Sequence, residues 1–432
     1  MKPDFYSPEY KRYQRAYVTQ CTLEHLLGIL VLDAFLAKLL SYIGLSDALV
    51  GVISSFVSVA FLFQLLSIGL VQSKLSTKKI VVTADVISQL AFMLIYFVPF
   101  IALPDSVKKL LVAGCVMLGQ VGKTIISSLY FKWANTYVDP EKRATFSARK
   151  ECISLIVGIV FSAVMGMVVD KFESIGSIEG GFLFIALAML IINIANFISF
   201  LLIKDETPEA RASMRVTTGE VLRHIISNKI FFRYIVYGFL FSIAGGLTGG
   251  FIGIYKTKDL AFSIFTIQIV NIAADFLRMG VSMPIARYSN KYGFMRGIQL
   301  AEFMTLFGYL IIVFTSPATR WLIIPYTLLT TASQAASYQN SFNIGYTLLP
   351  EKYMAQGMAI KRTLSGLVSF LASLVGGHIL NIVQVNGNTV LGIPMYAQQL
   401  LALISLSLYI PAILLQNRFI LKPLDEKLRA KE

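Results

Sequence analysis

The sequence predicts an all-α membrane protein in which twelve transmembrane helices form two pseudo-symmetric six-helix bundles. Of its 432 residues, 56% are hydrophobic and 14% are charged, whereas a soluble domain has about 45–50% apolar and about 25% charged residues. Twelve apolar segments are each long enough to cross a bilayer, which takes about 20 residues. Two loop sequences also recur at corresponding places in the two halves. These three observations define the predicted fold.

The composition excludes several classes of protein. A mean hydropathy of +0.69 does not fit a soluble enzyme, a disordered chain or a nucleic-acid-binding domain, despite a net charge of +14. In a membrane protein, excess Lys and Arg collects in cytoplasmic loops beside anionic lipid. The three cysteines fit neither a metal site nor a disulfide framework, so we expect no metal and no cofactor. The first sixteen residues are polar and aromatic, unlike a secretory signal.

The apolar segments define the predicted domain boundaries. The N-tail covers 1–16, the N-terminal bundle 17–203, a cytoplasmic linker 204–229, the C-terminal bundle 230–417 and the C-tail 418–432. The twelve spans lie at 17–41, 46–72, 80–103, 107–131, 147–170, 180–203, 230–254, 259–286, 295–316, 320–346, 356–383 and 394–417. A capping-box pattern at Thr217–Glu220 predicts a short amphipathic helix in the linker, with Val221, Leu222, Ile225 and Ile226 on its apolar face.

The basic residues predict the orientation of the spans. With the N-terminus inside, 29 of the 38 Lys and Arg residues fall in cytoplasmic segments and 6 in outside loops. This bias favours two cytoplasmic termini in a multi-pass protein. The short loops, which lack an N-glycosylation triplet, suit a bacterial inner (plasma) membrane.

Two repeated loops indicate that the halves arose by duplication. Pro-Glu-Lys begins at Pro140 in loop 4–5 and again at Pro350 in loop 10–11, 210 residues later. The segment Gly69–Lys79 in loop 2–3 corresponds to Ala286–Arg296 in loop 8–9. Duplicated six-span halves are typical of secondary transporters.

These loops resemble the signature G-x-x-x-D-R-x-G-R-K of the major facilitator superfamily. Loop 8–9 matches it at Asn290, Lys291 and Gly293. Loop 2–3 matches it at Gly69, Lys74 and Lys78, with Ser73 in place of Asp and Ser76 in place of Gly. The resemblance implies a twelve-helix transporter that works by alternating access, with helices 1, 4, 7 and 10 lining the substrate path. The residues expected at its cytoplasmic gate are Lys74, Lys78, Arg149, Glu151, Asn290, Lys291 and Gly293.

Ionisable residues in spans 1 and 4 are candidates for the transport path. Asp33 lies about 24 Å along a continuous first helix, where a buried carboxylate can carry a proton; a fixed ion pair with Lys38 is the alternative. Glu24 is a second candidate for proton coupling, or it snorkels to the interface. Lys123 shares a helix face with Gln120, and we expect it to hold an anionic group, to pair with Asp33, or to form a structural ion pair.

Spans 8 and 10 supply further polar residues. A stripe spaced at three and four residues contains Asn271, Asp275 and Arg278, between Gln268 and Ser282. It lines the path or its gate, or it joins helix 8 to a neighbour. In span 10, Gln334 and Tyr338 share a face suited to a polar ligand. Asp85 and Glu302 lie near cytoplasmic helix ends, where we expect them to pair with basic loop residues.

Span 7 contains four glycines within six residues: Gly245, Gly246, Gly249 and Gly250. Each weakens a helix by about 1 kcal/mol relative to alanine. We predict a hinge in a helix that lines the cavity, with close helix packing as the alternative explanation.

The predicted function is secondary active transport of a small organic solute by alternating access, coupled to protons or, alternatively, to sodium. Its expected partners are the lipid bilayer, the solute and the coupling ion, in a monomer that does not bind nucleic acid. A multidrug-type efflux pump for amphipathic compounds and a non-transporting membrane sensor are alternatives. An intramembrane enzyme is not favoured, because the sequence has no recognisable catalytic motif.

Overall fold

The computed structural model describes residues 5–64, 76–139, 142–205 and 218–423. The chain divides into two compact units. Unit 1 contains Met1–Leu45, Phe63–Arg215 and Ser263–Gln268, and unit 2 contains Ser46–Leu62, Val216–Phe262 and Ile269–Glu432. Ser46–Leu62, in predicted span 2, thus belongs to unit 2, and Ser263–Gln268, in predicted span 8, belongs to unit 1. The bounds of the predicted bundles stay a prediction.

Nine helices in the described ranges are long and apolar enough to cross a membrane. They match nine of the twelve predicted spans. The other three correspond to a first segment divided into two helices, to the shorter apolar segment Asp47–Phe63, and to the 26-residue helix Ile323–Leu348. That all twelve segments cross the membrane stays a prediction.

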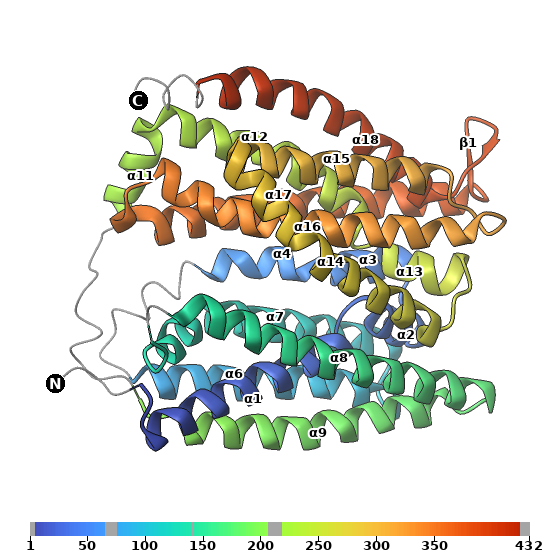
Figure 1. Ribbon diagram of the computed structural model, residues 1–432. Coiled ribbons are helices and arrows are strands. Elements are labelled where there is room, and N and C mark those ends of the chain that lie inside the picture. The colour runs from blue at the N-terminus through green and yellow to red at the C-terminus, as the bar shows by residue number, and fades with distance from the viewer. Residues whose placement is uncertain (1–4, 65–75, 140–141, 206–217, 424–432) are drawn as a thin grey trace. The chain divides into compact units, whose positions relative to one another are not determined.

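Unit 1 consists of helices packed side by side (Figure 1). Helix α6 packs on α7, and α1 packs on both α8 and α9. The helices of unit 1 are α1 (Pro8–Leu30), α2 (Asp33–Tyr42), α6 (Thr77–Phe97), η2 (Val98–Phe100), α7 (Asp105–Asn135), α8 (Arg143–Ser174) and α9 (Ile178–Leu202). The starts of α1, α6 and α8 lie at one end of the unit, together with the ends of α7 and α9 (Figure 1).

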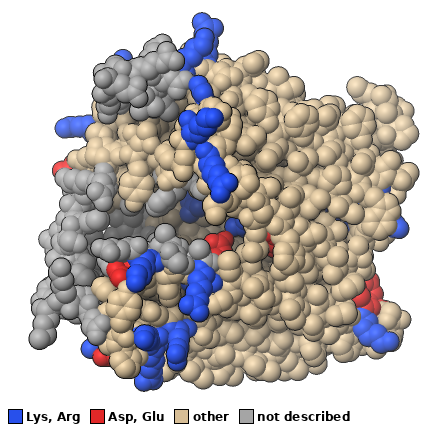
Figure 2. Space-filling view, in the orientation of Figure 1, with Lys and Arg blue, Asp and Glu red and all other residues tan. Residues whose placement is uncertain are grey.

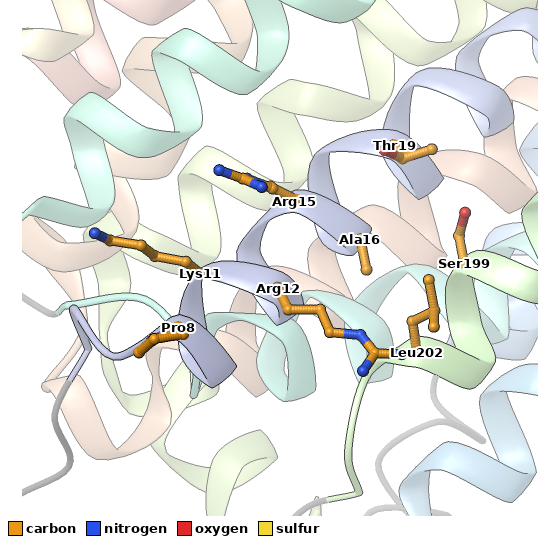
Figure 3. Close-up of a pocket in the computed structure, with 8 residues that line it drawn as sticks. All are labelled: Pro8, Lys11, Arg12, Arg15, Ala16, Thr19, Ser199 and Leu202. Atoms are coloured by element: carbon orange, nitrogen blue, oxygen red, sulfur yellow. The ribbon is translucent and has the colours of Figure 1, made fainter.

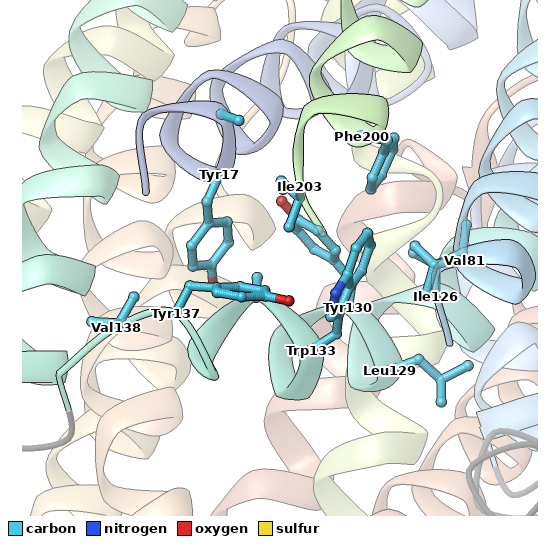
Figure 4. Close-up of a cluster of buried hydrophobic side chains, with 12 residues drawn as sticks. Tyr17, Val81, Ile126, Leu129, Tyr130, Trp133, Tyr137, Val138, Phe200 and Ile203 are labelled. Carbon is cyan, nitrogen blue, oxygen red and sulfur yellow. The ribbon is translucent and has the colours of Figure 1, made fainter. Parts of the chain in front are cut away.

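An aromatic cluster holds this end of unit 1 together (Figure 4). Trp133 is fully buried and stacks on Phe200, with ring centroids 6.4 Å apart. Its indole Nε1 donates to the carbonyl of Lys204 at 2.8 Å, and the hydroxyl of Tyr137 donates to the same oxygen at 2.8 Å. Burial and hydrogen bonding therefore both fix the end of α7 to the chain that follows α9.

Two charged residues cap neighbouring helices at the same end. Asp205 accepts hydrogen bonds from the Ser76 hydroxyl and from the backbone amide of Lys78, at the start of α6. The Nζ of Lys78 donates to the carbonyls of Leu201 and Ile203 at 2.9 and 2.7 Å, at the end of α9. An acid at a helix start and a base at a helix end both match the helix dipole.

The first predicted span is not one continuous helix. Helix α1 ends at Leu30, and α2 begins at Asp33, whose φ of 47° lies in the left-handed region. Asp tolerates this conformation better than most residues. The hydroxyl of Tyr96 donates to the carbonyl of Leu30, so the break does not leave that oxygen without a donor.

Unit 2 is built around two helix pairs. Helix α12 packs on α17, and α15 packs on α16, while α18 contacts both α12 and α15. The longer helices of unit 2 are α12 (Lys229–Gly249), α14 (Ile264–Tyr292, which begins in unit 1), α15 (Phe294–Val313), α16 (Ile323–Leu348), α17 (Glu351–Val385) and α18 (Ala397–Gln416). The shorter elements are α3 (Asp47–Ser54), α4 (Phe56–Ala60), η1 (Phe61–Phe63, which ends at the unit 1 boundary), α11 (Thr218–Ser227), α13 (Ile252–Ile254), η4 (Tyr255–Asp259), η5 (Arg320–Leu322) and η6 (Asn417–Leu421). A two-residue strand pair, β1 (Thr389–Val390) and β2 (Ile393–Pro394), is antiparallel.

The glycines of span 7 serve two different purposes. A Cβ atom on Gly246 would lie 2.0 Å from the carbonyl oxygen of Ser369, and one on Gly250 would lie 2.3 Å from that of Gly51. These two glycines therefore permit close packing of α12 on α17 and of the following turn on α3. Gly245 and Gly249 face open space, and α12 ends at Gly249. A hinge at this point stays a prediction.

The amphipathic linker helix forms as α11. Val221 and Ile225 are buried, while Leu222 and Ile226 are exposed, and the helix packs on α12 and α17. Thr217, the first residue of the expected capping box, lies outside the described residues.

An ion pair between a buried carboxylate and a lysine whose side chain is 56% exposed joins the start of α3 to the segment after α12. Asp47 is 3% exposed and accepts from the Nζ of Lys258 with both carboxylate oxygens, each at 2.8 Å. The side-chain amide of Gln384 in α17 donates to Asp47 at 2.6 Å. Three segments of unit 2 thus meet at one carboxylate.

Replacing Trp133 by Ala should lower the free energy of unfolding by about 3–5 kcal/mol, the usual cost of removing a large buried ring. Denaturation of the purified protein in detergent measures this change. Trp321 is 56% exposed and serves as the control, because Trp321→Ala should cost less than about 1 kcal/mol. Equal losses in the two variants would contradict the anchoring role of Trp133.

Replacing Lys258 by Met should destabilise the protein by about 1–3 kcal/mol, because it deprives a buried carboxylate of its charged donor. The matched control is Lys38→Met, which removes an ion pair whose carboxylate, Glu173, is 45% exposed, whereas Asp47 is 3% exposed. Such exposed pairs contribute about 0–1 kcal/mol. The same unfolding assay separates the two, and a control as damaging as Lys258→Met would count against the Asp47 junction.

Candidate functional site

Unit 1 contains a cluster of charged side chains, here called the Asp85 cluster: Glu24 of α1, Asp85 of α6 and Lys123 of α7. Asp85 is buried, and the other two are half-buried. Asp85 is 2% exposed and accepts from the side-chain amide of Asn196 in α9 at 2.8 Å. Glu24 accepts from the amide of Gln20, one turn earlier in α1, at 2.9 Å. Side chains from three helices thus bring two carboxylates and one amine together.

Lys123 is the cation of this cluster. Its Nζ lies 3.5 Å from the position that a Cβ atom on Gly28 would occupy, and 5.4 Å from the ring centroid of Phe92. Glu24 and Asp85 both lie within electrostatic range of it. A lone charge in the middle of a membrane helix costs about 2.5–3.5 kcal/mol on insertion scales. The opposite charges of Glu24 and Asp85 offset part of this cost, and one added proton would make the cluster neutral.

Unit 2 contains a cavity of about 260 Å³, here called the Glu302 pocket. Five helices supply its walls, which combine aromatic rings, hydroxyl groups and two charged side chains. The lining residues are Tyr234, Tyr237, Gly238, Phe241, Ser242, Ile298, Glu302, Thr305, Ser337, Ser341, Lys361, Ser365 and Tyr409. Ligand sites commonly combine apolar walls with a few polar groups in this way.

The charged groups of the Glu302 pocket have aromatic neighbours. The Nζ of Lys361 lies 4.0 Å from the ring centroid of Tyr234, a cation–π distance. The hydroxyl of Tyr234 donates to Ser341 at 3.4 Å. Glu302 is 7% exposed, lies beside Tyr237 and is within electrostatic range of Lys361. The pocket therefore offers an acid, a base and several neutral hydrogen-bonding groups.

Rings form one wall of the same pocket. Phe241 lies edge-on to both Tyr237 and Tyr409, with centroid distances of 4.7 and 4.6 Å. This edge-to-face geometry is a favoured arrangement of aromatic pairs. It leaves a wall against which a planar or ring-shaped solute can stack.

The two units share a chemical pattern. Glu302 follows Asp85 by 217 residues, the separation that also relates the repeated loops beginning at Gly69 and Ala286. Tyr234 follows Tyr17 by the same interval. The Nζ of Lys150 lies 4.8 Å from the Tyr17 ring, as Lys361 does from Tyr234 at 4.0 Å. Each repeat therefore carries a buried carboxylate on its third helix and a Lys–Tyr pair between its first and fifth helices.

Asp85 and Glu302 correct one sequence-based expectation. We expected both to pair with basic loop residues near helix ends. Both are buried, and their charged neighbours are Lys123 in α7 and Lys361 in α17. The repeat spacing of 217 residues could have identified them, because it aligns two acids within otherwise apolar helices.

The structure places the predicted path residues of unit 1 in different surroundings. Lys123 belongs to the Asp85 cluster and Gln120 is buried in α7. Asp33 is half-buried at the start of α2, beyond the break in the first segment. Lys38, its suggested ion-pair partner, is paired with Glu173. A role for Asp33 in the transport path stays a prediction. The expected depth of Asp33 in the membrane assumed one continuous first helix, which the structure does not have.

The predicted path residues of spans 8 and 10 lie outside the Glu302 pocket. Asn271 and the electrostatic pair Asp275 and Arg278 are half-buried in α14. Gln334 and Tyr338 are exposed on α16. The serines that do line the pocket, Ser337 and Ser341, follow the same four-residue spacing on a neighbouring face of α16. The predicted roles of the other residues stay predictions.

The predicted gate residues are only partly described. Lys74 lies outside the described residues, and Lys78 caps α9 as shown above. Gly293 has a φ of 99° and precedes α15, a conformation that favours glycine. The remaining gate residues are exposed: Arg149, Glu151, Asn290 and Lys291. Within the described ranges, no group of three His, Cys, Asp or Glu side chains is placed to hold a metal ion.

Solved structures of transporters share this fold. A mutant of the nucleoside transporter NupG matches with a TM-score of 0.73 at 12% identity, covering 93% of this chain and 98% of that chain. A D-xylose-proton symporter matches with a TM-score of 0.68 at 13% identity, covering 94% and 98%. A bacterial homologue of the iron transporter ferroportin in an inward-facing state matches at 0.63 and 12%, covering 94% and 98%.

No curated protein sequence matches the chain. The family model described as Major Facilitator Superfamily matches residues 24–373, a stretch that includes the Asp85 cluster and all of the Glu302 pocket except Tyr409. The chain is therefore a member of the Major Facilitator Superfamily of membrane transporters.

Proposed function

We propose that this protein is a secondary active transporter that moves a small organic solute across the membrane by alternating access. The observation that carries the proposal is the pair of buried charge sites at equivalent positions of the two repeats. Ionisable groups within membrane helices are expensive and mark substrate or ion pathways, and repeat-based transporters bind their substrates near the middle of the membrane.

The Glu302 pocket is the proposed solute site. Its tyrosine and phenylalanine rings provide a surface for stacking, and its hydroxyl groups and the Lys361–Glu302 pair provide donors and acceptors. These features suit a ring-shaped, hydroxyl-rich solute such as a sugar or a nucleoside. The NupG and D-xylose-proton symporter structures are named for solutes of this kind.

The Asp85 cluster is the proposed coupling site. Glu24 and Asp85 together with Lys123 have a formal net charge of −1, so uptake of one proton removes the net charge. A neutral cluster costs less to bury than a charged one, and this difference can link protonation to the conformational cycle. Sodium is the alternative coupling ion, because the same carboxylates could ligate it.

Efflux of amphipathic compounds is the second candidate function. The aromatic wall formed by Phe241, Tyr237 and Tyr409 also suits an apolar substrate. Solute polarity separates the two candidates. A purely apolar compound would displace water from Lys361 and Glu302 without forming hydrogen bonds to either side chain, which is unfavourable.

We further propose an inner-membrane location, a monomer and cytoplasmic termini. The starts of α1, α6 and α8 meet at the same end of unit 1, beside the ends of α7 and α9. In Figure 2, basic side chains gather where α1 begins. Basic residues concentrate on the cytoplasmic side of bacterial membrane proteins.

A thermal-shift screen of the purified protein against sugars, nucleosides, peptides and drugs should identify the solute, because a ligand of the native state raises the melting temperature. Uptake of that solute into proteoliposomes then tests transport. Stabilisation without any flux would favour the membrane-sensor alternative.

Replacing Lys361 by Gln should weaken binding of the identified solute at least tenfold, because a charge-assisted hydrogen bond contributes about 1.5–3 kcal/mol. Lys150→Gln is the matched control, since Lys150 makes the equivalent contact with Tyr17 in unit 1. Isothermal titration measures both. If both substitutions weakened solute binding equally, the Glu302 pocket would not be the solute-binding site.

Replacing Asp85 by Asn should abolish uptake driven by an imposed pH gradient but preserve solute exchange across the membrane, because exchange needs no net proton movement. Glu173→Gln, which changes an exposed carboxylate, should leave both activities intact. Asp33→Asn tests the sequence-based candidate in the same assay. Full pH-driven uptake by the Asp85 variant would refute the proposed coupling site.

A further inference from the structure

A second cavity lies in unit 1, between the first turns of α1 and the last turn of α9. Its volume is about 400 Å³, within the range of ligand sites, about 300–1,000 Å³. The lining residues that bear on its chemistry are Lys11, Arg12, Arg15 and Thr19 of α1, with Ser199 and Leu202 of α9 (Figure 3).

Three positive charges border this cavity within five residues. In Figure 3, Arg12 extends toward Leu202 of α9, whereas the side chains of Lys11 and Arg15 extend to the other side of α1, away from α9. Among the described residues, none of the three forms an ion pair. The nearby carboxylate of Glu9 accepts a hydrogen bond from Tyr13 at 2.5 Å. The three basic side chains therefore give the cavity border a net positive charge, which the carboxylate of Glu9 offsets only in part.

Capping of α9 does not explain why Arg12 lies at the end of that helix. The Nζ of Lys78 already donates to the carbonyls of Leu201 and Ile203. Trp133 and Tyr137 donate to the carbonyl of Lys204. Other donors thus satisfy the carbonyls of Leu201, Ile203 and Lys204, and the guanidinium of Arg12 forms no hydrogen bond with a residue that the structure describes.

The cavity lies at the boundary between polar and apolar sequence. The basic residues belong to the polar start of α1, and Thr19 stands at the beginning of the first apolar segment. Leu202 is the last residue of α9, a helix with the composition of a membrane span. Lipid phosphate groups lie at the same boundary of a bilayer, where Arg and Lys side chains extend toward them.

We propose that this cavity binds the phosphate group of an anionic phospholipid on the cytoplasmic side of the membrane. The planar guanidinium of Arg12 matches a phosphate with two parallel hydrogen bonds. The hydroxyl of Thr19 would bind the rest of the headgroup, and Leu202 would contact the start of an acyl chain. Lys11 and Arg15, which line the cavity but extend away from α9, would turn toward the bound phosphate. This site is distinct from the Asp85 cluster and does not depend on the transported solute.

The proposal is tested by measuring, with native mass spectrometry, how tightly the purified full-length protein binds short-chain phosphatidylglycerol. The double variant Arg12→Gln/Arg15→Gln should bind it roughly twenty-five-fold more weakly, since each basic residue near a lipid surface contributes about fivefold, or about 1 kcal/mol. The control Arg418→Gln/Lys422→Gln removes two exposed charges from the segment after α18 and should retain the affinity. Phosphatidylcholine and inorganic phosphate serve as the other ligands.

Selective loss of phosphatidylglycerol binding in the α1 variant would support the site. Equal loss in the two double variants would overturn it, because binding would then reflect overall charge. Inorganic phosphate that binds as tightly as phosphatidylglycerol, or equal binding of phosphatidylcholine, would refute an anionic lipid as the ligand.

Thr19→Phe keeps every charge and fills the cavity, so it tests shape separately. It should weaken phosphatidylglycerol binding without changing the melting temperature of the lipid-free protein. Unchanged lipid affinity in this variant would show that the cavity itself is not the binding site.

Discussion

The free-energy cost of placing charged side chains in the hydrocarbon core of a membrane is the main physical constraint on this protein. A single charge in the middle of a membrane helix costs about 2.5–3.5 kcal/mol, yet Asp85 and Glu302 are buried in α6 and α15. Each is accompanied by a lysine from another helix and by hydrogen-bonding side chains. The helices that supply these partners must pack in one arrangement, so the charge sites and the packing of each unit depend on each other.

The two repeats share a buried carboxylate and a Lys–Tyr pair but differ in the residue beside them. Glu24 in unit 1 and Phe241 in unit 2 are 217 residues apart, at equivalent places beside the shared Lys–Tyr pair. The carboxylate makes unit 1 a charge cluster with a formal charge of −1. The aromatic ring gives unit 2 an apolar wall and a cavity. This difference at equivalent positions contributes to the chemical contrast between the proposed coupling site and the proposed solute site.

The described end of unit 1 combines rigidity with exposed positive charge. Trp133, Tyr137, Lys78 and Asp205 fix the ends of α6, α7 and α9 through hydrogen bonds to backbone groups. Three basic residues of α1 border a cavity beside this fixed region. A lipid bound there would contact α1, the helix that also carries Glu24. The membrane itself could thus influence the helix that contributes to the charge cluster.

Composition and hydropathy determined that the chain is a helical membrane protein, because apolar length in a span is a local property that needs no knowledge of neighbours. The repeated loops also indicated the family and the duplication. Which polar residues meet depended on tertiary structure. Lys123 was identified from its unusual place in span 4, but its neighbours Glu24 and Asp85 come from other helices. The break before Asp33 and the choice of Ser337 and Ser341 over Gln334 and Tyr338 were decided by packing, since a helical stripe has no preferred partner until the surrounding helices are in place.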